Sequence, residues 1–373
     1  HSDVPIPRDR RRDVARPPGP SRLRALRGMT TPGAAPGFMV DLERAYPVMA
    51  HMTLIGDHLY VLSDPQAIVD LFITHGRETM KGRGLQGAKA VVGNGLLTSE
   101  GEVHLRNRRL VQPAFHRDRI AAYALAASAR IDRIVHRIID EHRAMGDTGD
   151  MLSMLIAAQE DGIGFTDAQV RDEAITLVLA GHETTAMTLT WTWMLLSQNP
   201  GWGEWLHEEL DALGGRTPGF DDLASLPRTR AVIAEAIRLY PPAWIQGRRM
   251  LADAHIEGWT IPEGALVIAS QFALHRSPRW WESSLSFTPQ RWIDADGAFS
   301  EDAPGQPRGA WFPFGWGNRR CIGEQFAWTE ATLVLATLAQ RWRPELVPGA
   351  DITPMPAVTL RTRSGMPMVL RRR

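Results

Sequence analysis

The chain of 373 residues has few of the features that mark secreted or membrane proteins. Its single cysteine, Cys321, cannot form an internal disulfide, which excludes a disulfide framework. The longest apolar runs are shorter than the roughly 18 to 20 residues that a bilayer-spanning helix requires. Residues 1–37 also lack the apolar core of a signal peptide or membrane anchor. We therefore expect a cytoplasmic protein without a membrane anchor.

The chain also lacks an excess of charge. It has 42 basic and 42 acidic residues, and of the basic ones only Lys81 and Lys89 are lysines. A nucleic-acid-binding protein normally shows its basic face in the total charge, so nucleic acid is not an expected partner. With 44% hydrophobic residues, the chain can bury a large core. We predict an irregular entry segment rich in proline and arginine over residues 1–37, followed by a single domain over residues 38–373.

The one cysteine lies in a glycine-rich stretch, residues 312–323, that leads into a helical pattern. Glycines at 315, 317 and 323 allow the backbone to fold closely around the sulfur, so that its N–H groups can donate to a thiolate. The alternative is a buried structural cysteine beside a glycine-rich turn. The stretch predicts a loop that holds a soft, anionic metal ligand.

The longest helical pattern covers residues 166–198, which begin with Thr166-Asp167 and are followed by Asn199-Pro200. Ala180, Gly181 and Thr184 share one face of this helix. The two small residues leave room for a flat ligand, although the glycine costs about 1 kcal/mol of helix stability. The alternative is a packing glycine with a threonine that hydrogen-bonds back to its own helix.

The remaining patterns indicate a mainly α protein with a small β region. We expect helices over 100–115, 202–213 and 228–239, and a hairpin over 48–62. A second hairpin is expected at the C-terminus, with residues 358–361 paired to residues 366–370.

The cysteine stretch resembles the signature of the cytochrome P450 family, Phe-x-x-Gly-x-Arg-x-Cys-x-Gly. Phe314, Gly317, Arg319, Cys321 and Gly323 occupy its fixed positions. The resemblance implies the P450 fold, with haem b (iron protoporphyrin IX) between the long central helix and the helix after the cysteine loop. It also implies that Cys321 ligates the iron, that Phe314 packs beside the sulfur, and that Arg319 reaches a propionate. Gly315 and Gly323 would line the cofactor.

The central helix matches the oxygen-activation motif of this family, Ala/Gly-Gly-x-Asp/Glu-Thr, at Ala180 to Thr184. By resemblance, Ala180 and Gly181 lie against the cofactor, and Glu183 and Thr184 are the catalytic residues. The carboxylate would relay protons and the hydroxyl would hydrogen-bond the reacting oxygen or its water. His182 faces away from that side and is interpreted as structural.

Two further motifs of the family point to a structural network. Glu235 and Arg238 match Glu-x-x-Arg, and Arg291 closes a match to Phe-x-Pro-x-Arg that starts at Phe287. In isolation, charges three residues apart usually form a solvated pair. The resemblance implies instead that Glu235, Arg238 and Arg291 form a buried network that fixes the cysteine loop.

Haem has two propionates that need cationic partners. The candidates by resemblance are His104 and Arg108, four apart on one helix, and Arg248. Arg249 is the alternative to Arg248 as a propionate partner, although the spacing to Ile261 and Gly264 favours Arg248.

The resemblance departs from the family in one respect. Between Arg108 and Ala180 the chain has fewer residues than the family places there, so we expect a segment to be missing near residues 126–130. The substrate pocket expected from the remaining chain is chiefly apolar, and a large hydrophobic substrate is predicted. Besides Ala180 and Thr184, it consists of Leu177, Ala243, Trp244, Ile245 and Val358.

The predicted function is that of a haem-thiolate monooxygenase that uses O₂ to hydroxylate a carotenoid, terpenoid or fatty acid. Residues 238–249 resemble a bacterial subgroup that includes a carotene hydroxylase. Electrons would come from a ferredoxin or flavodoxin with its reductase, docked near the exposed cations Arg106, Arg109 and Arg320. The alternatives are a peroxide-driven oxygenase and a haem-thiolate gas sensor or carrier.

Overall fold

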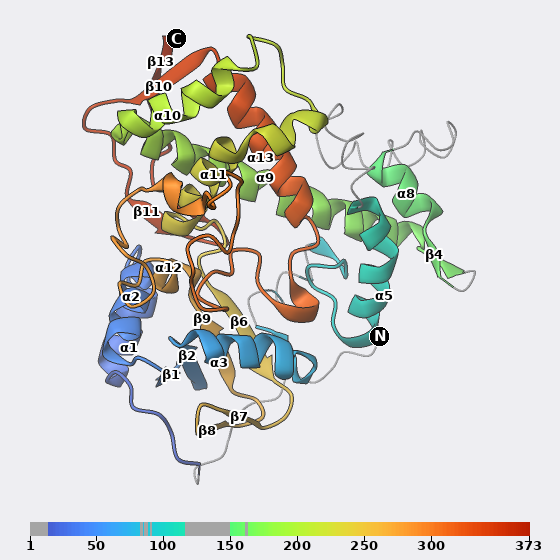
Figure 1. The fold of residues 1–373 in the computed structure, drawn as a ribbon. Helices are drawn as coiled ribbons and strands as arrows, with labels where there is room; N and C mark the ends of the chain where they lie inside the picture. Colours follow the sequence, from blue (N-terminus) through green and yellow to red (C-terminus); the bar gives the residue numbers. More distant parts are fainter. Residues whose placement is uncertain (1–13, 83–84, 86–88, 90–91, 116–149, 161–162) are drawn as a thin grey trace.

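The computed structural model describes residues 14–373 except 83–84, 86–88, 90–91, 116–149 and 161–162. Its described part is dominated by helices, with one five-stranded sheet and several two-stranded ribbons (Figure 1). The predicted fold class, mainly α with a small β region, is confirmed.

Helix α9 (Asp167–Gln198) is the longest described helix and runs through the middle of the molecule (Figure 1). Its start is fixed by a capping box, because the Thr166 N–H donates to Gln169 Oε1 at 2.9 Å and the Gln169 N–H donates to Thr166 Oγ1 at 3.3 Å. Its end is fixed by Asn199, after which α10 (Pro200–Asp211) begins with a proline in its first turn. The predicted boundaries of the central helix are confirmed.

Two helices pack on α9 and build the main core. They are α11 (Pro227–Leu239) and α13 (Glu324–Ala339), the helix that follows the cysteine loop. Trp191 of α9, Ile233 of α11 and Leu335 of α13 are fully buried in this one cluster. The core thereby holds the start of α13, and with it the cysteine loop, at a defined place relative to α9.

The five-stranded sheet has the order β1-β2-β9-β6-β3. Strands β1 (Met49–Leu54) and β2 (Asp57–Leu62) form the predicted hairpin, turned at Ile55-Gly56, where both φ angles are positive. Strand β9 (Leu266–Ala269) runs parallel to β2 and antiparallel to β6 (Gln246–Met250), which pairs with β3 (Thr79–Lys81). The sheet therefore brings residues near 80 beside residues near 248.

The other described helices and strands are short or lie at the edges of the molecule (Figure 1). The helical ones are α1 (Arg22–Thr30), α2 (Ala35–Ala45), α3 (Pro65–Val69), the π-helix η1 (Asp70–Thr74), η2 (Gly76–Glu78), α5 (Gly101–Val111), η3 (Gln112–Phe115), α8 (Met151–Ala157), η4 (Phe220–Ser225), α12 (Gln271–Leu274), η5 (Pro289–Trp292) and η6 (Gly317–Arg319). The strands are β4 (Gln159–Glu160), β5 (Ile163–Gly164), β7 (Ala254–Ile256), β8 (Trp259–Ile261), β10 (Trp342–Leu346), β11 (Pro354–Pro356), β12 (Leu360–Thr362) and β13 (Met368–Arg372).

The predicted irregular segment over residues 1–37 is wrong where the structure describes it. Helix α1 lies inside this segment, and α2 runs across its predicted end. The Ser21 side chain caps α1, and Pro36 lies in the first turn of α2, where a proline is tolerated. Ala25 is fully buried in a cluster with residues of the sheet, so α1 belongs to the main body of the protein.

The predicted C-terminal hairpin is also wrong. Strand β12 pairs with β11, and β13 pairs with β10, so neither predicted strand pairs with the other. Strand β13 thus pairs with a distant segment and β12 with a nearby one, because strand pairing depends on side-chain packing across the strands as well as on turns. The segment expected to be missing near residues 126–130 lies outside the described residues.

Within the described ranges, none of the helices combines the length and apolar character needed to cross a bilayer.

Candidate functional site

The cysteine loop is shaped by two glycines with positive φ, Gly315 at 71° and Gly317 at 67°. A Cβ atom at position 317 would collide with the Phe72 carbonyl of η1, so only glycine permits this close approach. The Cys321 N–H donates to the Phe314 carbonyl at 2.8 Å and closes the loop. The backbone therefore directs the sulfur by a fixed turn.

The Cys321 thiol lies in competing electrostatic surroundings. Solvent reaches the residue, yet protein atoms crowd around it, and the loss of solvation raises the pKa of the thiol. The Gly323 N–H, Arg108 and Arg320 act in the opposite direction and favour the thiolate. A positively charged metal at the sulfur would stabilise the thiolate further.

Basic side chains from four different elements gather next to this loop. Their mutual repulsion contributes to the lowered pKa values in the cluster. The members are Lys81 (β3), His104 and Arg108 (α5), Arg248 (β6) and Arg319 (η6). Arg108 Nη1 also donates to the Arg320 carbonyl at 2.8 Å, which ties the cluster to the cysteine loop. We call these five residues the basic cluster.

The basic cluster lacks enough negative charge to balance it within the described structure. Burial and Arg319 lower the pKa of Lys81 to about 7, and burial with four neighbouring cations lowers the pKa of His104 to about 2. Burial lowers the pKa of Arg248 to about 10. Glu100 forms an ion pair with Arg319, and both Glu100 and Glu173 act on Lys81. A ligand with two carboxylates would relieve this repulsion.

One buried polar atom of the basic cluster has no hydrogen-bond partner within the described structure. His104 is 3% exposed, and its Nδ1 has no hydrogen-bond partner among the described residues. Buried polar atoms are rarely left in this state. The observation favours a ligand atom at this position.

The structure separates the two rival arginines on β6. Arg248 lies in the basic cluster, over the Phe72 ring at 5.0 Å. Its neighbour Arg249 donates to the Gly264 carbonyl at 2.7 Å. Successive residues of a strand point to opposite faces, so only one of them can reach the cluster.

The middle of α9 offers open space beside small residues. Ala180 is exposed, and a Cβ atom at Gly181 would meet nothing within 4 Å. Thr184 Oγ1 donates to the Ala180 carbonyl at 2.7 Å, which is the local hydrogen bond considered as an alternative for this residue. Glu183 is half-buried and His182 is exposed. A flat group can lie against this face of the helix.

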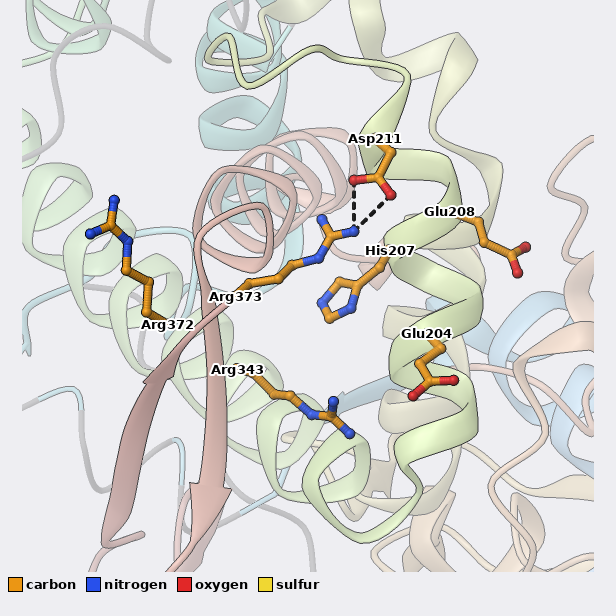
Figure 2. A pocket seen from close by; sticks show the side chains of 7 residues that line it. All are labelled: Glu204, His207, Glu208, Asp211, Arg343, Arg372 and Arg373. Carbon is orange, nitrogen blue, oxygen red and sulfur yellow. Dashed lines mark hydrogen bonds and ion pairs between the residues drawn. The ribbon is translucent and has the colours of Figure 1, made fainter.

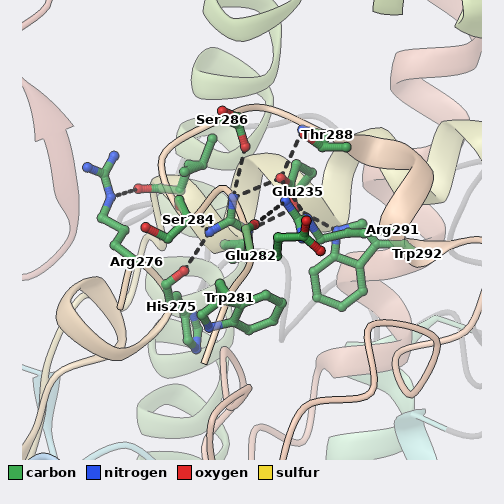
Figure 3. A network of polar contacts seen from close by, with 12 residues as sticks. Glu235, His275, Arg276, Trp281, Glu282, Ser284, Ser286, Thr288, Arg291 and Trp292 are labelled. Carbon is green, nitrogen blue, oxygen red and sulfur yellow. Dashed lines mark hydrogen bonds and ion pairs between the residues drawn. The ribbon is translucent and has the colours of Figure 1, made fainter. Parts of the chain in front are cut away.

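Glu235, Arg238 and Arg291 are brought together in a buried network (Figure 3). Glu235 and Arg238 have fully buried side chains and form two hydrogen bonds of 2.8 Å. Arg291 Nε and the Trp292 indole N–H also donate to the Glu235 carboxylate, at 3.2 Å and 2.9 Å. Every carboxylate oxygen is therefore used as an acceptor, as a buried charge requires.

The predicted pocket residues do not share one environment. Trp244 is 7% exposed and packs in the core between the sheet and α2, with its indole N–H donating to the Ala357 carbonyl. Val358 is 87% exposed. Leu177 packs against the cluster that contains Val111, Leu155 and Val170, Ile245 lies at the edge of the Trp244 cluster, and Ala243 is half-buried. Their joint role as a pocket wall stays a prediction.

A cavity of about 340 Å³ lies between α10 and the β10-β13 ribbon (Figure 2). His207 points between Arg343 and Arg373, and Arg373 pairs with Asp211 at 2.6 Å. Its lining contains three acids and three arginines: Glu204, Glu208, Asp211, Arg343, Arg372 and Arg373. This balanced, charged lining suits neither an apolar substrate nor a dicarboxylate.

These features together fit a haem. In the part of the chain that the structure describes, no three His, Cys, Asp or Glu residues converge as metal ligands, so a metal at Cys321 needs ligands from another molecule. A porphyrin supplies them, its propionates suit the basic cluster, and its flat ring suits the open face at Gly181. Sequence reasoning missed Lys81 and Glu100. Lys81 is one of two lysines in the chain, which was an available signal.

Comparisons with known proteins relate this chain to one family. A family model described as Cytochrome P450 matches residues 123–366. The chain is 36% identical to cyclooctatin synthase of Streptomyces melanosporofaciens over 73% of this chain and 78% of the relative. It is 32% identical to cyclooctat-9-en-7-ol 5-monooxygenase of the same organism over 87% of this chain and 91% of that relative. It is 41% identical to pentalenene oxygenase of Streptomyces avermitilis over 61% of this chain and 50% of that relative.

The fold is also found among solved structures. The crystal structure of cytochrome P450DA heme domain has a TM-score of 0.84 and 22% sequence identity, and the match covers 96% of this chain and 98% of that chain. At this identity the likeness supports the fold alone, and it confirms the fold predicted from the sequence.

Proposed function

Because this chain belongs to the cytochrome P450 family and is a haem-containing monooxygenase, we propose that it hydroxylates a hydrophobic terpenoid. The observation that carries the proposal is its similarity to relatives that modify terpenoids, at 32 to 41% identity. The narrower similarity to a carotene hydroxylase stays a prediction. The alternatives, a gas sensor and a peroxide-driven oxygenase, are not favoured, because the relatives are named as a synthase, a monooxygenase and an oxygenase.

The haem supplies the iron at which dioxygen is activated. We propose that the Cys321 thiolate is its protein ligand, because the loop directs this sulfur and the thiolate donates electron density that favours O–O cleavage. The basic cluster would hold the propionates, and Ala180 with Gly181 would border the ring. Phe314 would pack beside the sulfur, with Gly315 and Gly323 allowing the close approach of the loop.

We propose that Glu183 and Thr184 control protons at the reaction centre. The Thr184 hydroxyl proton is engaged with the Ala180 carbonyl, so its oxygen is left to accept a hydrogen bond from a water in the pocket. Glu183 is the adjacent carboxylate, half-buried on the same helix, and can exchange protons with solvent. The pair would hold water in one orientation and limit its unproductive entry.

Replacement of Thr184 by alanine should uncouple the reaction. The haem content stays unchanged, but product formed per NADPH consumed falls about 10-fold or more and hydrogen peroxide rises, because a positioned proton-transfer group contributes about 10² to 10⁴ in rate. Thr190→Ala is the matched control, since Thr190 Oγ1 makes the same bond to the Ala186 carbonyl at 2.8 Å. Tight coupling in the Thr184 variant contradicts the assignment.

Electrons come from a separate redox partner, and we propose a ferredoxin or flavodoxin with its reductase. Of the three predicted docking cations, Arg320 makes two bonds of 2.6 Å to Glu324, and Arg106 donates to the Gly164 carbonyl at 3.2 Å. An acidic partner would therefore meet a surface of partly paired arginines, together with Arg109. A cytoplasmic location and a single haem-binding domain up to residue 373 are proposed from the sequence.

The substrate class is tested by binding and by turnover. Terpenoid hydrocarbons and alcohols, a carotene and a fatty acid are titrated into the haem-loaded protein, and the spin-state change of the iron is followed by absorbance. Ligands that respond are incubated with NADPH and a surrogate ferredoxin and reductase, and products are identified by mass spectrometry. We expect singly hydroxylated terpenoids. Turnover of only the fatty acid or the carotene contradicts the proposed substrate.

A further inference from the structure

His275 is a buried histidine that the mechanism above does not use. It follows α12, is fully buried, and lies beside the Glu235 network (Figure 3). We propose that His275 is a positioning residue that transmits the rigidity of this network to the Cys321 thiolate. The proposal rests on the proposed role of Cys321 as the iron ligand.

Two hydrogen bonds place His275 between the network and the loop. Its backbone carbonyl accepts from Arg238 Nη1 at 2.7 Å, and its ring Nε2 accepts from the Phe312 N–H at 3.2 Å. The first bond fixes the main chain of His275 to a fully buried arginine. The second bond fixes the residue with which the cysteine loop begins. The imidazole is thus a direct link between the two structures.

The chemistry of the two partners determines the tautomer. A backbone N–H can only donate, so Nε2 of His275 must be unprotonated and the ring proton lies on Nδ1. Burial and the adjacent Arg238 hold the pKa of His275 well below its usual range. The ring therefore remains neutral and remains an acceptor at physiological pH.

Aromatic neighbours hold the plane of the imidazole. The Trp311 ring lies 4.8 Å from it and the Phe312 ring lies 5.4 Å away, nearly perpendicular. Trp281 packs against Trp311 in the same cluster, and the Arg238 guanidinium lies over the Trp281 ring at 5.1 Å. The ring cannot turn away from Phe312 without disturbing this cluster.

A series of backbone hydrogen bonds leads from His275 to the sulfur. The Phe312 carbonyl accepts from the Gly315 N–H at 3.0 Å, and the Phe314 carbonyl accepts from the Cys321 N–H at 2.8 Å. Each turn fixes the position of the next. Without the imidazole, the Phe312 N–H would be a buried donor without an acceptor, and the start of the loop would shift to find one.

The test compares three substitutions in the haem-loaded protein. His275→Gln keeps an acceptor at the position of Nε2, His275→Asn has an acceptor that is too short to reach Phe312, and His275→Leu has none. The measurement is the spectrum of the reduced carbon monoxide adduct, which separates thiolate-ligated from neutral-ligated haem, followed over time in mild urea. Ser277→Ala is the control, because Ser277 is 2% exposed and bonds Glu43 instead of the loop.

We expect conversion to neutral-ligated haem to be about three- to tenfold faster in the Asn and Leu variants, the range for a lost buried hydrogen bond. The Gln variant should convert at close to the wild-type rate. Equal conversion rates in the Gln and Asn variants overturn the inference, even where the Leu variant does not fold. A Ser277→Ala variant that converts as fast as the Asn variant also overturns it. Failure of the proposed function is distinguishable, because the wild-type protein would then show no thiolate-type spectrum.

Discussion

Replacing Cys321 by serine is expected to abolish hydroxylation and the thiolate-type spectrum of the reduced carbon monoxide adduct. A hydroxyl has nearly the size of a thiol, but it does not ionise at neutral pH and cannot donate electron density as a thiolate does. The loop itself should persist, because it is closed by the Cys321 N–H and shaped by Gly315 and Gly317, none of which the substitution alters. Product formation should fall to the level of the haem-free protein.

Haem content must be measured in the same samples. The basic cluster does not depend on the sulfur, so we expect the Cys321→Ser protein to retain haem with weakened affinity. This retention separates loss of the ligand from loss of the cofactor. A serine variant that binds haem fully and forms product at the wild-type rate would show that another residue ligates the iron.

The substitution Glu235→Gln should lower the free energy of unfolding by about 3–5 kcal/mol, the cost of removing one partner from a buried ion pair. One oxygen of Glu235 accepts from Arg238, Arg291 and the Thr288 N–H, and the other accepts from Arg238 and Trp292. A glutamine amide group would face donors in either orientation. The two arginines would also lose their shared counter-ion inside the protein.

A surface pair provides the matched control for this effect. Arg371 and Glu345 form an ion pair of 3.0 Å, and both side chains are about half exposed. Glu345→Gln should cost less than about 1 kcal/mol, because exposed pairs contribute little. Unfolding of the haem-loaded proteins in urea is followed by far-ultraviolet circular dichroism. Equal effects of the two substitutions would mean that the Glu235 network does not stabilise the fold.

Local patterns predicted several elements well, and for a physical reason. The limits of α9 depend on Thr166 and on Asn199-Pro200, which act on the backbone within a few residues. The β1-β2 hairpin depends on its turn at Gly56 in the same way. The prediction of an irregular entry segment is wrong because a proline in the first turn, such as Pro36 of α2, does not prevent a helix.

Pairing between distant segments could not be predicted from such patterns. Of the two strands expected to form a C-terminal hairpin, β13 pairs with the distant β10 and β12 pairs with the nearby β11, because strand pairing depends on packing against the whole fold. Trp244 was predicted to line a pocket, which stays a prediction, and the structure packs it in the core with its indole N–H donating to the Ala357 carbonyl. An apolar residue near a cofactor motif can line a pocket or pack in the core.

The sequence by itself predicted the chemistry that is proposed for this protein. The cysteine loop, the Ala180 to Thr184 segment and the Glu235-Arg238 pair each lie on one short stretch, so their spacing identifies them. Only the tertiary structure decided which residues join them. It placed Arg248 in the basic cluster and Arg249 against the Gly264 carbonyl, added Lys81 and Glu100 to the cluster, and placed His275 against Phe312. Glu100 and Arg319 are 219 positions apart, and a contact over such a distance depends on packing that no local pattern contains.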